Sequence, residues 1–334
     1  MRGQLLVSTA EGFFLVSGIV LGIVRGAKLV DTKFVDVAKT VLKRALQLYI
    51  TYVLLVVIFT LIAWYVYPNS PGVKAGVMQM KDFWLMLWNT LGLQYTYGWA
   101  DYLRFYAIFI FFAPVALWLL RKKLWYVVLA ISFGVWHFFT PELRSMPWDM
   151  TQILQPIPWQ VLFFIGLTIG FHWPDIASFV ENHKRRLVRY VATPLIGVAI
   201  VLFLINVFAV FAAEFTSAEW AQSLRNMAMA LRDGSFDKEE LTAPRLLLFL
   251  LWFWAWFIIV TWFQKPILKY AGWLLVPFGT NSLYVYTLQS VIVFFIHIYF
   301  TSTWLLPNFI IVAGSIALIY FAIKTKFLMN IIPR

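Results

Sequence analysis

The chain consists mainly of apolar runs that are long enough to cross a lipid bilayer as helices. Each run has roughly 20 residues, and a helix of that length covers about 30 Å of hydrocarbon. Hydrophobic residues make up 62% of the sequence and charged residues 13%, which a water-soluble fold of this length does not sustain. We therefore predict an all-α, polytopic integral membrane protein in which residues 1–334 form a single domain.

Hydropathy and the charged or turn-forming residues at the ends of the runs predict nine transmembrane helices. They cover approximately residues 4–24, 45–66, 102–120, 124–139, 158–172, 190–213, 245–263, 274–299 and 305–323. A basic amphipathic helix is also expected within residues 25–44, where Phe34, Val37 and Val41 recur at helical spacing. Residues 82–94 are apolar but too short to cross, which leaves an interfacial or a re-entrant helix.

The formal net charge of +12 comes from basic residues that gather in short loops after every second span. This is the positive-inside pattern of a multi-pass protein of the inner (plasma) membrane, and it places the C-terminus in the cytoplasm. The charge therefore indicates orientation and contact with membrane lipid, with no nucleic-acid partner expected. Nine spans put the N-terminus outside, so we expect one further helix upstream of Met1 and ten in total, with both ends inside.

Metal and thiol chemistry find little support in the residue inventory. The absence of cysteine excludes disulfides, thiol catalysis and Cys-ligated zinc or iron–sulfur sites. The four histidines are scattered along the chain, so no metal site and no bound cofactor are predicted.

Polar groups inside the apolar runs are the candidates for function, because an ionised side chain at a helix centre costs about 2.5 to 3.5 kcal/mol unless it is paired or wet. Glu11 lies at the edge of the first run, where Gly12, Ser17, Gly18 and Gly22 let another helix approach closely enough to supply a polar partner. The other candidates are Arg44, Arg104, Gln160, Arg245, Asn281, Tyr286 and Gln289.

Each candidate also has a structural interpretation. Arg44 and Arg245 lie at the ends of spans, where such side chains extend to the interface. Glu11 is expected to pair with Arg104 or Arg245, either to build a site or only to fix the bundle. Asn281, Tyr286 and Gln289, together with Ser282, recur at about four residues and line either a polar cavity or a helix seam.

Several stretches, in order along nearly the whole chain, resemble the OpgC family of succinyltransferases that modify osmoregulated periplasmic glucans, a branch of the acyltransferase type three superfamily. They are residues 10–18 (AEGFFLVSG), 43–49 (KRALQLY), 103–106 (LRFY), 155–166 (QPIPWQVLFFIG), 244–247 (PRLL) and 278–286 (FGTNSLYVY). The resemblance implies about ten helices and transfer of an acyl group, succinyl or acetyl, from cytoplasmic acyl-CoA to a hydroxyl of an envelope or periplasmic glucan. The family's first helix carries an arginine and a catalytic histidine that have no counterpart in this chain.

Roles for individual residues follow from this resemblance. Lys43 and Arg44 are expected to bind the phosphates of the acyl donor, because cations form strong charge-assisted hydrogen bonds with phosphate. Arg104, Gln160, Arg245, Asn281, Tyr286 and Gln289 are expected to bind substrate, and Glu11 is the candidate catalytic residue. Two other functions stay open: a catalytically inactive family member, and a carrier or flippase for an envelope glycan or lipid precursor.

Overall fold

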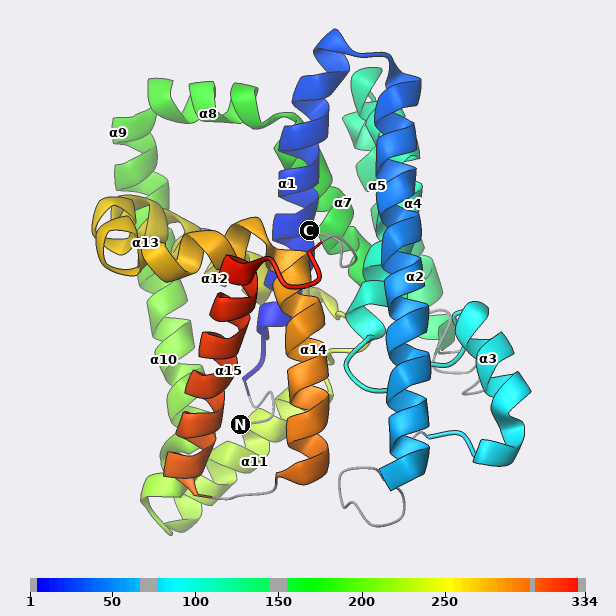
Figure 1. Ribbon diagram of the computed structural model, residues 1–334. Coiled ribbons are helices and arrows are strands. Elements are labelled where there is room, and N and C mark those ends of the chain that lie inside the picture. The colour runs from blue at the N-terminus through cyan, green and yellow to red at the C-terminus, as the bar shows by residue number, and fades with distance from the viewer. Residues whose placement is uncertain (1–4, 67–76, 144–154, 301–303, 330–334) are drawn as a thin grey trace. The chain divides into compact units, whose positions relative to one another are not determined.

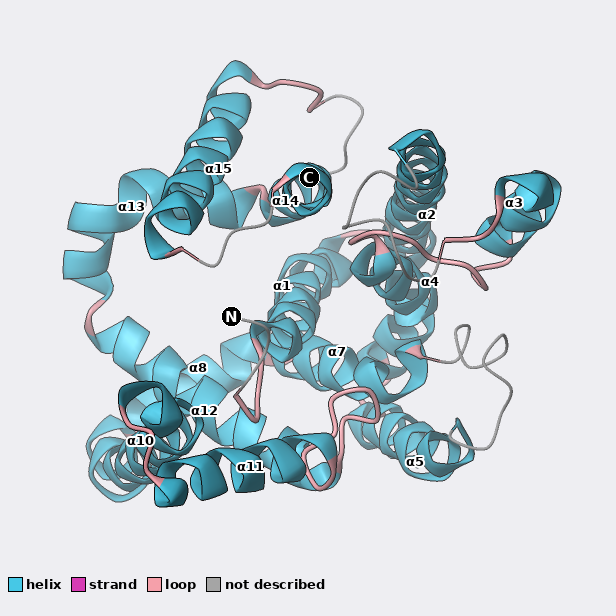
Figure 2. Ribbon diagram, turned by 90° about the horizontal axis from the view of Figure 1, so that it is seen from below, coloured by secondary structure: helices cyan, strands magenta, loops and turns pink. Residues whose placement is uncertain are grey.

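The computed structural model describes residues 5–66, 77–143, 155–300 and 304–329, and the regular elements within these ranges are all helices (Figure 2). The contacts divide the chain into two compact units. Unit 1 comprises Met1–Val37, Ala113–Pro147 and Leu154–Gln264, and unit 2 comprises Ala38–Phe112, Trp148–Ile153 and Lys265–Arg334. Each unit is described by itself, and the single domain over residues 1–334 stays a prediction.

Unit 1 holds the first helix and most of the central part of the chain. Its elements are α1 (Thr9–Asp31), α5 (Trp125–Leu143), α7 (Pro156–Phe171), α8 (Trp173–Asn182), α9 (Lys184–Leu187), a π-helical turn (Val188–Ala192), α10 (Thr193–Phe215), α11 (Glu219–Asp233) and α12 (Ala243–Trp262).

Unit 2 holds most of the second helix and the C-terminal helices. Its elements are a short 3₁₀ turn (Met80–Asp82), α3 (Phe83–Leu91), α13 (Gln264–Thr280), α14 (Ser282–Tyr299) and α15 (Leu305–Thr325). Two long helices, α2 (Phe34–Val66) and α4 (Asp101–Arg121), begin in one unit and end in the other (Figure 1).

Seven helices in the described ranges are long and apolar enough to cross a membrane, and an eighth is counted if α7 and α8 form one bent span. The multi-pass character of the chain agrees with the sequence prediction, while the count of nine stays a prediction. The apolar part of α5, Trp125–Phe138, is shorter than these spans. The expected span 274–299 is divided in the structure, because α13 ends at Thr280 and α14 begins at Ser282.

The amphipathic helix expected within residues 25–44 is not a separate element. The first helix continues to Asp31 and the second begins at Phe34, so this segment is shared between the ends of two long helices. Val37 and Val41 are buried, which explains their helical spacing by packing of α2 within the protein.

Glycines on α1 and α7 bring these two helices into backbone contact within unit 1. A Cβ added to Gly18 would lie 2.1 Å from the carbonyl oxygen of Phe163, and one added to Gly170 would lie 2.0 Å from that of Ile19. A Cβ added to Gly22 would lie 2.5 Å from the carbonyl oxygen of Leu167, and one added to Gly166 would lie 2.2 Å from that of Leu15. Both helices carry a glycine every fourth residue, the spacing that lets apolar helices approach closely in lipid.

Residues 78–91, in the part of the chain before α4, run alongside α2 within unit 2. The indole nitrogen of Trp64 donates to the carbonyl of Met78 at 2.6 Å, and the hydroxyl of Tyr49 donates to that of Leu91 at 2.7 Å. The two side chains are 15 residues apart on α2, which corresponds to about 22 Å of helix. Both interpretations of residues 82–94, an interfacial and a re-entrant helix, stay predictions.

Candidate functional site

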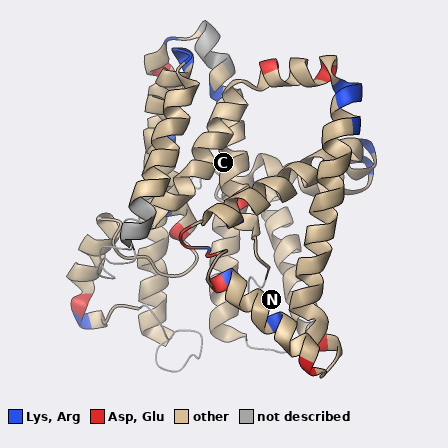
Figure 3. Cartoon of the chain, turned by 180° about the vertical axis from the view of Figure 1, so that it is seen from behind, with Lys and Arg blue, Asp and Glu red and all other residues tan. Residues whose placement is uncertain are grey.

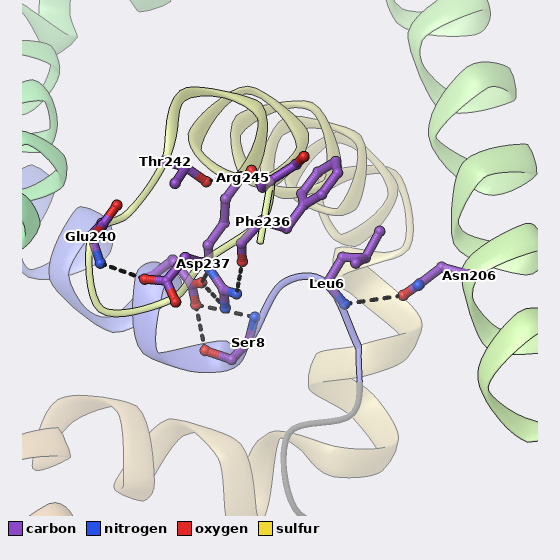
Figure 4. A network of polar contacts seen from close by, with 10 residues as sticks. Leu6, Ser8, Asn206, Phe236, Asp237, Glu240, Thr242 and Arg245 are labelled. Carbon is purple, nitrogen blue, oxygen red and sulfur yellow. Dashed lines mark hydrogen bonds and ion pairs between the residues drawn. The ribbon is translucent and has the colours of Figure 1, made fainter. Parts of the chain in front are cut away.

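The guanidinium of Arg245, labelled in Figure 4, meets the carboxylate of Glu11 in the interior of unit 1. Nε of Arg245 donates to Oε1 of Glu11 at 2.6 Å, and Nη2 approaches the same oxygen at 2.5 Å. Glu11 is 0% and Arg245 1% exposed. Of the two arginines expected as partners for Glu11, the structure selects Arg245.

Glu11 also takes part in the N-terminal cap of α1. Its Oε2 accepts hydrogen bonds from the backbone nitrogen of Ser8 at 3.1 Å and from the hydroxyl of Ser8 at 2.5 Å. A glutamate three residues after an N-cap serine that bonds back to the serine N–H is half of a capping box. With two donors on each oxygen, the four acceptor positions of the carboxylate are occupied.

The close helix contact made by the glycines and the polar partner of Glu11 come from different helices. We expected the small residues of α1 to admit the helix that pairs with Glu11. Gly18 and Gly22 instead face α7, whereas Arg245 belongs to α12. The nearest atom to a Cβ on Gly12 is a ring carbon of Phe249, at 4.0 Å. Close packing and charge neutralisation are therefore separate properties of α1.

The connection from α11 to α12 closes over this charge pair. Nη1 of Arg245 donates to the carbonyl of Phe236 at 3.0 Å, and the indole nitrogen of Trp136 on α5 donates to that of Leu241 at 3.0 Å. The hydroxyl of Thr242 bonds to the carbonyl of Ser235 at 2.7 Å. At the end of α11, a hydrogen bond from Arg232 lowers the pKa of the Asp233 carboxyl.

A second polar contact holds the residues that lead into α1. Oδ1 of Asn206, on α10, accepts a hydrogen bond from the backbone nitrogen of Leu6 at 3.3 Å (Figure 4). Asn206 is 5% exposed although it lies within the apolar helix α10. The approach to α1 is thus fixed at Leu6 by α10 and at Ser8 by Glu11.

Gln160 connects α7 to α5. Its Oε1 accepts from the hydroxyl of Ser132, and its Nε2 donates to the backbone carbonyl of Ser132, both at 2.7 Å. Gln160 is 8% exposed and Ser132 is 3% exposed. Both ends of the amide are used between two helices, so this side chain acts in the structure as a clamp.

Arg104 and Tyr286 serve the irregular backbone that follows α3 in unit 2. Nη1 of Arg104 donates to the carbonyl of Leu93 at 3.0 Å, and the hydroxyl of Tyr286 donates to that of Trp99 at 2.9 Å. Ser290, one turn along α14, donates to the same carbonyl at 2.8 Å. Non-helical backbone at membrane depth needs such partners, because lipid supplies none.

Asn281 and Gln289 are not brought together with these groups. Nδ2 of Asn281 donates to the carbonyl of Pro277 at 2.9 Å, at the break between α13 and α14. Gln289 is exposed. The buried face of α14 is a different one, formed by Leu283, Tyr284, Thr287, Ser290, Phe294 and Ile298.

The two residues expected to hold the acyl donor lie early in α2. Lys43 is exposed and Arg44 is half-buried. The Nε atom of Arg44 is buried and has no hydrogen-bond partner within the described part of the chain. The guanidinium of Arg44 therefore keeps a buried donor that an anionic ligand could accept.

A family model described as OpgC protein matches residues 5–329. The chain belongs to the OpgC family. The match confirms the resemblance found in the ordered stretches of sequence. No curated protein and no solved structure matches the chain.

Sequence reasoning about this OpgC-family chain missed several residues of its polar contacts, among them Ser8, Asn206 and Ser132. Ser8 forms a recognisable S-x-x-E capping signal with Glu11, which the sequence already displays. Asn206 is an amide within an apolar run, the same type of signal that selected Asn281. Ser132 carries no signal of its own, because small hydroxyl residues are frequent in membrane helices.

Proposed function

We propose that this OpgC-family protein is a membrane O-acyltransferase that moves a succinyl or acetyl group from acyl-CoA to a hydroxyl of an envelope or periplasmic glucan. The family match over residues 5–329 carries this proposal. A multi-pass protein of the inner membrane with a cytoplasmic C-terminus meets a cytoplasmic donor on one side and a periplasmic acceptor on the other. The site residues named below are part of the proposal.

The transfer itself balances without a bound cofactor. The oxygen of the glucan hydroxyl attacks the thioester carbonyl and the C–S bond breaks. A base takes the hydroxyl proton and delivers it to the departing sulfur, so coenzyme A leaves as its thiol. Lys43 and the Nε–H group of Arg44 bind the phosphates of acyl-CoA. Membrane lipid surrounds the spans.

In this proposal Glu11 and Arg245 are positioning residues. A carboxylate that already accepts three hydrogen bonds and is paired with Nη2 of Arg245 is a poor acceptor for a further proton. The pair instead neutralises two buried charges and holds the α11–α12 connection against α1, where a saccharide acceptor would be oriented. This use of Glu11 also supports the second candidate function, an inactive family member that retains the fold.

The test is an acyl transfer assay in membranes that contain the protein, with isotope-labelled succinyl-CoA or acetyl-CoA and a mixture of periplasmic glucans. We expect label to appear in the glucan together with an equal amount of free coenzyme A thiol. Arg44→Gln should raise the KM for acyl-CoA roughly tenfold, as expected for loss of about 1.4 kcal/mol of charge-assisted bonding. The exposed Lys122→Gln serves as its control.

The alternatives give different results in the same assay. Folded protein without label transfer or thiol release would contradict the acyltransferase and leave an inactive family member. Movement of glucan or lipid precursor across the membrane without thiol release would instead indicate a carrier.

A further inference from the structure

The corner formed by α8 and α9 in unit 1 has an apolar face that the described parts of the protein cover only in part, because Trp173 packs against Phe257 of α12 while the residues towards α9 are exposed. None of the residues of α8 is buried, and on its apolar face Ala177 is exposed and Val180 is 45% exposed. Trp173, Ile176, Ala177 and Val180 recur at positions i, i+3, i+4 and i+7, which places them on one side of the helix. Asp175, Ser178 and Asn182 occupy the opposite side, and Glu181 lies at the border between the two sides.

The direction of α8 differs from that of the apolar helix before it. The helix leaves α7 with a bend of 67° at His172 (Figure 1). The 16 residues of α7 cover only about 24 Å, slightly less than the hydrocarbon core, so α8 begins at the edge of the apolar layer. Trp173 is the first residue of α8, and tryptophan side chains are enriched at the membrane–water interface.

A basic cluster follows directly on α8. It consists of Lys184, Arg185, Arg186 and Arg189, against which α8 contributes two carboxylates, Asp175 and Glu181. The three cations of α9 are exposed, and the four-residue helix lies where the chain turns towards α10 (Figure 3). Lys184 approaches Glu181 at 3.5 Å, so Arg185 and Arg186 carry the charge that is directed outward.

We propose that this corner, residues 173–189, is a membrane-surface anchor whose apolar side enters the lipid interface and whose Arg185 and Arg186 bind anionic phospholipid headgroups. An amphipathic helix flanked by cations binds anionic bilayers through buried apolar area and electrostatic attraction together. Each cation near such a surface strengthens binding roughly fivefold. The anchor fixes the angle between α7 and α10 and does not depend on any reaction.

Because the chain contains no cysteine, single thiols can report on the two faces of α8. Val180→Cys and Ser178→Cys are reconstituted in vesicles of phosphatidylcholine with or without phosphatidylglycerol and treated with a water-soluble thiol reagent. We expect labelling at position 180 to be at least about tenfold slower than at 178, as for a side chain held in the interface. Equal rates at the two positions would overturn the proposal.

The headgroup part of the proposal has its own readout. Phosphatidylglycerol should slow labelling at position 180 several-fold further, and Arg185→Gln with Arg186→Gln should abolish that effect. Arg121→Gln with Lys122→Gln, two exposed cations at the end of α4, is the matched control and should leave the effect intact. Loss of the lipid effect in the control, or its persistence without Arg185 and Arg186, would refute anionic lipid binding at this corner.

Discussion

Arg245 and Glu11 are 234 residues apart in the chain, yet the guanidinium of one lies 2.6 Å from the carboxylate of the other in the interior of unit 1. The pair links the first turn of α1 to the first turn of α12. Through Ser8 on one side and Phe236 on the other, it also fixes the segments that lead into these helices. Two buried charges at this depth are tolerated because each neutralises the other.

Removal of either member of the pair is expected to destabilise the protein strongly. Glu11→Gln and Arg245→Met should each lower the free energy of unfolding by about 3 to 5 kcal/mol, because each leaves an uncompensated buried group. The double variant should lose clearly less than the sum. Thermal unfolding in nanodiscs measures this double-mutant cycle. The exposed Glu219→Gln is the control and should change the free energy of unfolding by nearly zero. Additive losses would show that the two side chains do not interact.

The contact between α1 and α7 is expected not to tolerate one added methyl group at its glycines. In Gly170→Ala the new Cβ would lie 2.0 Å from the Ile19 carbonyl oxygen, so the helices must separate and the free energy of unfolding should fall by about 1 to 3 kcal/mol. Gly197→Ala on α10 is the matched control, because a Cβ there meets nothing within 4 Å. The control should be neutral or slightly stabilising. Similar losses in both variants would argue against backbone contact.

Tyr286 and Ser290 are expected to act as partly redundant hydrogen-bond donors to the carbonyl of Trp99. Tyr286→Phe and Ser290→Ala should each cost less than about 1 kcal/mol, since one donor remains. The double variant removes both donors from α14 and should cost more than the sum of the singles. Resistance of residues 92–100 to proteolysis measures the effect locally. Strict additivity would mean that the two hydroxyls act independently.

Gln160 and Gln289 are expected to differ although both were candidates for substrate binding. Gln160→Met removes both bonds to Ser132 and should lower the free energy of unfolding by about 1 to 3 kcal/mol. Gln289→Met changes an exposed side chain and should leave thermal stability unchanged. A neutral Gln160→Met would show that the clamp between α5 and α7 contributes nothing.

The membrane character and family of the chain were evident from sequence, because hydropathy and ordered motifs are local properties that need no partner. The same holds for Glu11, whose position in an apolar run demanded a neighbour. Arg104 and Tyr286 illustrate the limit of this reasoning. As polar groups in spans they indicated substrate contacts, whereas in the structure both donate to the backbone carbonyls of residues after α3.

By itself the sequence determined that the chain forms apolar helices, that it belongs with the OpgC proteins, and that a few buried polar groups must be paired. Only the tertiary structure decided which group pairs with which. It selected Arg245 over Arg104 for Glu11 and assigned the glycines of α1 to α7, because contacts between distant segments depend on how whole helices pack. Periodicity along one helix identifies the face that is buried but not the helix that covers it.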